Sequence, residues 1–168
     1  MRSGLYKALA LPGVPGCEAA GKVVAIGPGV NDFQIGDRVA YVTSVYAADA
    51  AKCLLPTLQA LKLPDTVSDL LAETTLLRAL TVEMLVCRVH RIEAGMTILV
   101  HAAAGGVGSL LCQWAAHVCA TVIGTVGSEA KAAAVKAPGC AHEILYCEIE
   151  FKSAVMENNA KARRRYSL

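Results

Sequence analysis

The segment that most constrains the fold is an apolar strand pattern that runs directly into a glycine-rich turn and a helix. The segment 97–101 is short and rich in branched apolar side chains, as in a buried parallel strand. The turn AAGGVG follows at 103–108. From 106 to 119 the apolar side chains recur at helical spacing. This order predicts a strand, a tight turn and an amphipathic helix.

The same alternation continues along the chain. Residues 120–126 and 143–146 are predicted strands, and 129–136 is a predicted helix between them. A βαβαβ order is typical of one half of a doubly wound parallel sheet, so the sequence predicts an α/β fold here.

The first part of the chain has a different pattern. Gly- and Pro-containing turns separate short apolar runs, which predicts a small β-rich barrel or sandwich. The predicted strands are 21–27, 38–43, 52–55 and 60–63. Two predicted helices follow, over 68–77 and 81–91, and Ser68 is a candidate N-cap for the first.

Composition excludes several classes of protein. Hydrophobic residues make up 55% of the chain and charged residues 18%, which excludes a disordered chain. A net charge of +2 predicts no binding to nucleic acid, and the basic run 161–165 is expected to stay solvated. The run 95–128 lacks charged side chains, but glycines, His101 and Gln113 interrupt it, so no membrane span is predicted.

The cysteines indicate a reducing compartment. The chain has seven, none in a CxxC pair, and no secretory signal opens it. We therefore expect a cytoplasmic protein whose thiols serve as small core residues.

The glycine-rich turn carries the candidate chemistry. A dinucleotide pyrophosphate binds against backbone N–H groups at a helix N-terminus, which requires small residues at the turn. Ala104, Gly105 and Gly106 provide them, and Gly108 lets the helix pack closely. The alternative is a purely structural turn.

The second predicted strand indicates which dinucleotide is preferred. NAD sites place an acidic residue at its end, where it binds the ribose hydroxyl groups. Here the strand is followed by Gly127 and Ser128, with Lys131 nearby, which suits a 2′-phosphate and therefore NADPH. The alternative is that Lys131 is only a solvated helix charge.

These motifs resemble a known family. The segment 95–108, extended to Gln113, is similar to the signature of the zinc-free quinone oxidoreductases (zeta-crystallin-like) of the medium-chain dehydrogenase/reductase superfamily. Further matching segments are RSGLY at 2–6, GCEAAG at 16–21, GDRV at 36–39 and LT at 80–81. The resemblance covers about residues 2–151.

The resemblance implies an incomplete GroES-like β-rich catalytic domain over 1–77 and an incomplete Rossmann domain over 78–151. Residues 152–168 would form a basic tail outside the family pattern. The implied activity is NADPH-dependent hydride transfer to quinones, enones or related electron-poor conjugated carbonyl compounds. The implied cofactor contacts are Thr81, Gly105, Gly106, Val107, Gly127, Ser128, Lys131 and Tyr146. Tyr6 would lie near the nicotinamide and is the candidate catalytic residue.

No metal is expected. Zinc-dependent relatives have a His where this chain has Cys17, which is itself a competent ligand. The position of a second ligand, around Leu77 and Arg78, offers none, and the four-cysteine zinc lobe of alcohol dehydrogenases is missing.

Family members are about twice as long, so the sequence predicts a chain truncated at both ends. The strands that complete the sheet and form the family's homodimer would be missing, which would leave an apolar face of the sheet uncovered. The alternative function is therefore an inactive fragment that binds nucleotide weakly or pairs with a full-length paralogue.

Overall fold

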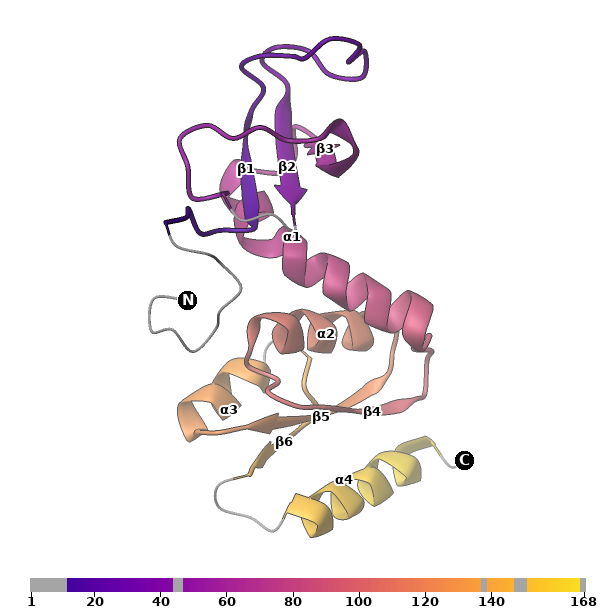
Figure 1. Ribbon diagram of the computed structural model, residues 1–168. Coiled ribbons are helices and arrows are strands. Elements are labelled where there is room, and N and C mark those ends of the chain that lie inside the picture. The colour runs from indigo at the N-terminus through magenta and orange to yellow at the C-terminus, as the bar shows by residue number, and fades with distance from the viewer. Residues whose placement is uncertain (1–11, 44–46, 137–138, 147–150, 167–168) are drawn as a thin grey trace. The chain divides into compact units, whose positions relative to one another are not determined.

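The structure, a computed structural model, describes residues 12–43, 47–136, 139–146 and 151–166 (Figure 1). It divides into two compact units, Met1–Leu77 and Arg78–Leu168, and each is described by itself.

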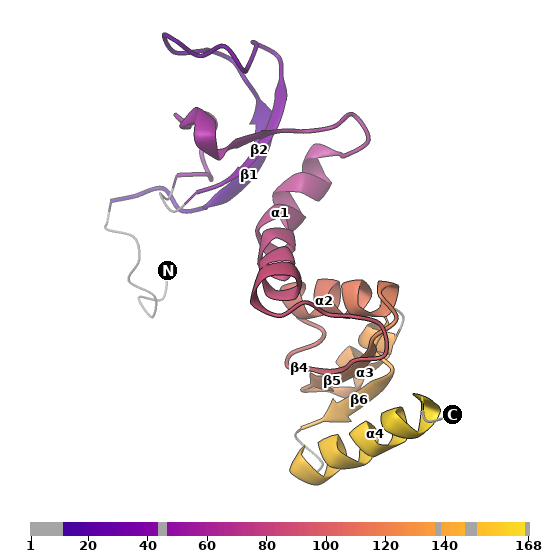
Figure 2. The same cartoon turned by 90° about the vertical axis from the view of Figure 1, so that its right-hand side faces the viewer.

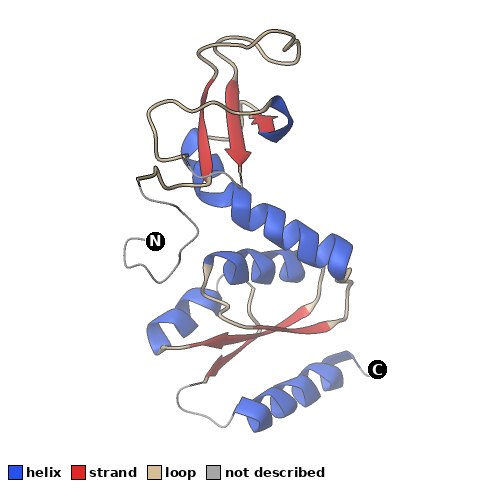
Figure 3. Ribbon diagram, viewed as in Figure 1, coloured by secondary structure: helices blue, strands red, loops and turns tan. Residues whose placement is uncertain are grey.

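The first unit contains a three-stranded antiparallel sheet (Figure 3). Its strands are β1 (Glu18–Lys22), β2 (Arg38–Val42) and β3 (Ala60–Lys62), with β2 in the centre. A 3₁₀ turn, η1 (Thr57–Gln59), precedes β3. The core of this unit comes from β2, whose Val39, Ala40 and Tyr41 are buried.

Two of the strands predicted for this unit are wrong: one has different bounds, and the other is not a strand. The strand expected over 21–27 is β1, which ends at Lys22 because Lys22 pairs with Arg38, the first residue of β2. Beyond it, Val24 and Ile26 are exposed. The segment 52–55 is not a strand, and its Leu54 is fully exposed.

A single helix replaces the two expected over 68–77 and 81–91. Helix α1 (Asp69–Glu83) runs directly into a π-helical segment, η2 (Met84–Val89). No Gly or Pro lies between residues 69 and 89 to interrupt it. Ser68 caps α1 as predicted, since its Oγ accepts the N–H of Leu71 at 3.1 Å.

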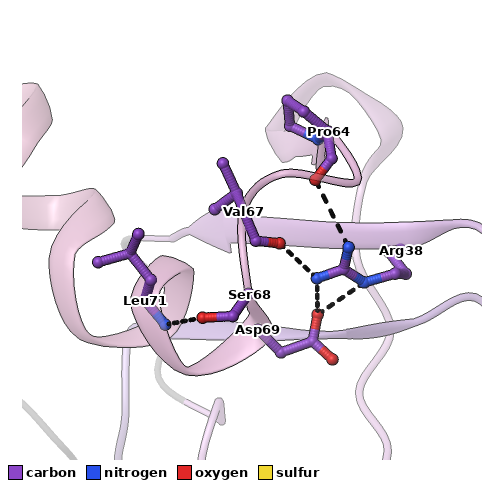
Figure 4. A network of polar contacts seen from close by, with 6 residues as sticks. All are labelled: Arg38, Pro64, Val67, Ser68, Asp69 and Leu71. Carbon is purple, nitrogen blue, oxygen red and sulfur yellow. Dashed lines mark hydrogen bonds and ion pairs between the residues drawn. The ribbon is translucent and has the colours of Figure 1, made fainter.

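Arg38 fixes the start of α1 against β2 (Figure 4). Its Nη2 and Nε donate to Oδ1 of Asp69 at 2.7 and 3.0 Å, and Nη2 also donates to the carbonyl of Val67 at 2.6 Å. A weaker bond of 3.5 Å reaches the carbonyl of Pro64. One partly buried guanidinium thus satisfies both the acidic first turn of the helix and the turn before it.

The second unit is a parallel sheet in the order β4-β5-β6. Strand β4 (Thr97–Val100) connects through helix α2 (Gly106–His117) to β5 (Thr121–Val126). Helix α3 (Glu129–Lys136) then connects β5 to β6 (His142–Leu145). This is the predicted βαβαβ order. Helix α2 ends two residues earlier than expected, and Cys119 just beyond it has a positive φ of 62° that a helix cannot continue.

All six residues of β5 are buried, so the core of this unit lies around its central strand. Helices α2 and α3 pack on one face of the sheet, and helix α4 (Phe151–Tyr166) lies on the opposite face against β5 and β6 (Figures 1 and 2). The expectation that this face is uncovered is therefore wrong. The polar composition of 152–168 concealed a helix that is long enough to cover the two strands.

Within the described ranges, the structure contains no helix that is both long and apolar enough to cross a membrane.

The contacts of Arg38 predict a measurable effect on stability. Replacing Arg38 with Met removes hydrogen bonds to one carboxylate and one close carbonyl, and we expect a loss of about 1–2 kcal/mol in the free energy of unfolding. Urea titration followed by far-UV circular dichroism measures this loss. The matched control is Lys62→Met, which breaks an exposed ion pair with Asp37 and should change stability much less. Equal effects of the two substitutions would contradict this account.

Candidate functional site

The turn between β4 and α2 is held by backbone hydrogen bonds. Ala102 adopts a positive φ of 51°, and its carbonyl accepts the N–H of Gly105 at 2.7 Å. The N–H of Ala103 donates to the carbonyl of Thr125 on β5 at 3.0 Å. The side-chain hydroxyl of Thr125 also accepts the N–H of Ala102 at 3.3 Å. The turn is therefore fixed to the central strand.

Glycine is required at position 108. A Cβ there would meet the carbonyl oxygen of Ala102 and would come within 2.9 Å of Cα of Ala103. Both are backbone atoms of the turn and cannot move aside. A Cβ on Gly105 would lie 3.0 Å from the same carbonyl, a tight contact that a shift of a few tenths of an ångström relieves. Gly108 therefore brings the first turn of α2 against the turn after β4.

The first residues of α2 present free donors. Gly105 is the N-cap and supplies no side chain, and its own N–H is used by Ala102. The N–H groups of Gly106, Val107 and Gly108 have no acceptor among the described residues. Together with the helix dipole, these three N–H groups could hold an anion. Because Gly105 and Gly106 are exposed and Ala104 is half-buried, a pyrophosphate group can approach these donors closely.

A second group of predicted residues gathers after β5. The hydroxyl oxygen of Tyr146, which follows β6, lies 2.7 Å from the point that a Cβ on Gly127 would occupy. Ser128 caps α3, and its Oγ accepts the N–H of Lys131 at 3.4 Å. As an acceptor in that bond, the hydroxyl of Ser128 keeps its own proton available for another partner. Lys131 and Tyr146 are exposed.

Both groups lie at the carboxyl edge of the parallel sheet. The turn at 101–105 follows β4, residues 127–131 follow β5, and Tyr146 follows β6. Open α/β sheets bind ligands at this edge. The structure thus brings free N–H groups beside the first strand and a hydroxyl with a cation beside the second, the two sets of residues that the sequence analysis expects to contact a dinucleotide.

Helix α1 adds a residue that the sequence analysis missed. The Nε atom of Arg78 lies 2.6 Å from the point that a Cβ on Gly106 would occupy. Thr81, a predicted contact, follows three residues later and so shares a face of α1 with Arg78; it is half-buried. That helical spacing is the signal that could have identified Arg78. Tyr6, the candidate catalytic residue, lies outside the described residues.

The cysteines only partly follow the prediction. Cys112 on α2 and Cys140 before β6 are buried in the core, whereas Cys53, Cys87 and Cys119 are exposed. The hydrogen bond with Cys140, together with burial, raises the pKa of the Cys112 thiol, so it remains protonated. His101, which its position at the end of a predicted strand would place in the core, is instead exposed and hydrogen-bonded to Thr125. Among the residues that the structure describes, no three His, Cys, Asp or Glu side chains are grouped to hold a metal ion.

Known proteins match both units. Residues 1–65 match the alcohol dehydrogenase GroES-like domain. The quinone oxidoreductase of Pseudomonas aeruginosa is 40% identical over 93% of this chain and 48% of the relative. The 2-haloacrylate reductase of a Burkholderia species is 38% identical over 87% of this chain and 44% of the relative.

A solved structure agrees with these relatives. The crystal structure of Escherichia coli quinone oxidoreductase in complex with NADPH superposes with a TM-score of 0.90 at 38% identity. The match covers 95% of this chain, so it extends into α4. It covers 49% of the solved chain. The chain thus spans about half the length of the relatives it matches. Over nearly its whole length, the chain is therefore similar to one half of the quinone oxidoreductases, and its first 65 residues match their GroES-like domain.

Proposed function

We propose that this chain binds NADPH at the carboxyl edge of its parallel sheet and serves an oxidoreductase that reduces quinones or related electron-poor conjugated carbonyl compounds. The observation that carries the proposal is the set of three N–H groups, at Gly106, Val107 and Gly108, that find no acceptor in the described part of the chain. With Ala104 and Gly105 they would hold the pyrophosphate. When bound, the dinucleotide supplies the hydride for such a reduction.

The choice of NADPH over NADH rests on the second group of residues. Ser128 retains a donor and Lys131 a positive charge, and both suit a 2′-phosphate. No acidic side chain stands at 127–128, where NAD sites place one. Tyr146 over Gly127 would border the adenosine, and Thr81 on α1 would lie toward the nicotinamide half. The NADPH bound to the E. coli relative supports this choice.

The substrate class follows from two relatives with different substrates. One acts on quinones and the other on a 2-haloacrylate, as their names state. Both substrates carry a carbon–carbon double bond conjugated to a carbonyl group. Such a bond accepts a hydride once substrate and donor are held in contact, so positioning rather than a strong acid would dominate.

We also infer the division of the chain. Residues 1–77 would be catalytic-domain sequence, 78–151 the first half of a nucleotide-binding domain, and 152–168 a further segment. The match of 1–65 to the GroES-like domain and the parallel sheet of the second unit support the first two.

Activity is tested with the purified, folded chain, NADPH and either benzoquinone or a naphthoquinone. We expect quinone-dependent loss of NADPH absorbance, because the chain would hold the hydride donor. The control omits the quinone. Tight NADPH binding without any turnover would limit the function of this chain to binding, and absence of both would reject the proposal.

Replacing Lys131 with Ala tests the cofactor preference. Since only NADPH carries the 2′-phosphate, we expect its dissociation constant to rise about tenfold, while that for NADH stays within twofold. Isothermal titration calorimetry measures both constants. Lys152→Ala, an exposed lysine on α4, is the matched control. Equal losses for the two nucleotides would show that Lys131 does not recognise the 2′-phosphate.

A further inference from the structure

The guanidinium of Arg78 lies beside the free N–H groups of α2. Measured from the point that a Cβ on Gly106 would occupy, its Nε, Cδ and Cζ atoms are 2.6, 2.7 and 3.0 Å away. The side chain is exposed. Over the described part of the chain, no hydrogen bond or ion pair engages it. A full positive charge therefore remains unneutralised at the start of the helix.

We propose that Arg78 binds the pyrophosphate of the dinucleotide, so that the phosphates lie between its guanidinium and the first N–H groups of α2. This inference rests on the proposed function. The N–H groups supply neutral donors and only part of a unit charge. A guanidinium adds a whole charge and a planar pair of donors that matches two phosphate oxygens.

The geometry gives a second reason for a glycine at 106, besides the room that a pyrophosphate needs at this turn. A side chain at 108 would collide with backbone, whereas the three atoms nearest to a Cβ at 106 all belong to the movable end of Arg78. The fold therefore does not require glycine at 106. Glycine at 106 is instead needed for the guanidinium of Arg78 to lie this close to the first turn of α2, where its positive charge faces the free N–H groups.

Two ligands can distinguish a loss of pyrophosphate binding by Arg78 from a general loss of nucleotide binding. Adenosine diphosphate carries the two linked phosphates, whereas adenosine 2′-monophosphate carries only the phosphate assigned to Ser128 and Lys131. Arg78→Gln should weaken adenosine diphosphate and NADPH about tenfold and leave adenosine 2′-monophosphate within twofold. The matched control is Arg91→Gln, which removes an exposed arginine from the segment before β4.

The experiment is calorimetric titration of the whole chain and its variants with these three ligands, with circular dichroism to verify folding. If the wild type does not bind NADPH, the proposed function fails. If the wild type binds and Arg78→Gln binds adenosine diphosphate equally well, only the role of Arg78 fails. Equal losses for both adenosine nucleotides, or an equal loss in Arg91→Gln, would also overturn that role.

A second variant keeps the test decisive should Arg78→Gln fail to fold. Gly106→Ala leaves the guanidinium in the chain but pushes it from its place, because the three atoms nearest to the added methyl group belong to Arg78. We expect weaker binding of adenosine diphosphate, unchanged binding of adenosine 2′-monophosphate and unchanged circular dichroism. Unchanged affinity for adenosine diphosphate would contradict the proposal.

Discussion

The close approach of helix α2 to the turn after β4 is the constraint on which the site depends. It exists because residue 108 has no side chain, and the carbonyl of Ala102 and Cα of Ala103 fill the space that a Cβ would need. The turn itself is tied to β5 through Thr125. A rigid strand therefore fixes the start of the helix, and the free N–H groups at Gly106–Gly108 point to the carboxyl edge of the sheet without any side chain having to order them.

Positive charge is distributed at this edge in two places. Arg78 stands beside the start of α2, and Lys131 with Ser128 stands at the start of α3. NADPH carries negative charge in two places, the pyrophosphate and the 2′-phosphate. The proposed function assigns one set of residues to each, which is why single substitutions in the two sets are expected to discriminate between ligands. Below them lies the buried strand β5, and the thiol of Cys112 beside it stays protonated because its hydrogen bond with Cys140 and its burial raise its pKa.

Local patterns predicted the second unit well. The strand–turn–helix order, the start of α2 at Gly106 and the whole of α3 were read from spacing and glycine positions. The N-cap at Ser68 was predicted for the same reason, because capping depends on neighbouring residues. The glycine turn and the Ser128–Lys131 pair came from the same local signals.

What failed depends on contacts distant in sequence. The end of β1 is set by the length of its partner β2, and 52–55 has apolar residues but no partner strand. Helix α4 covers the sheet despite a polar composition. Helical spacing could have placed Arg78 on the face of Thr81, but Arg78 precedes Gly106 by 28 residues, so its contact with the start of α2 could not be predicted. Sequence motifs locate backbone sites better than the side chains that complete them.

The most direct test compares the NADPH affinity of Gly108→Ala with that of Gly105→Ala by calorimetric titration. Both add one methyl group to the same turn, but only the first forces backbone atoms apart. The account predicts at least a tenfold loss for Gly108→Ala, because overpacking of about 1–3 kcal/mol would move the N–H groups of α2, and little change for Gly105→Ala. Wild-type affinity in folded Gly108→Ala would contradict the claim that this close approach builds the site.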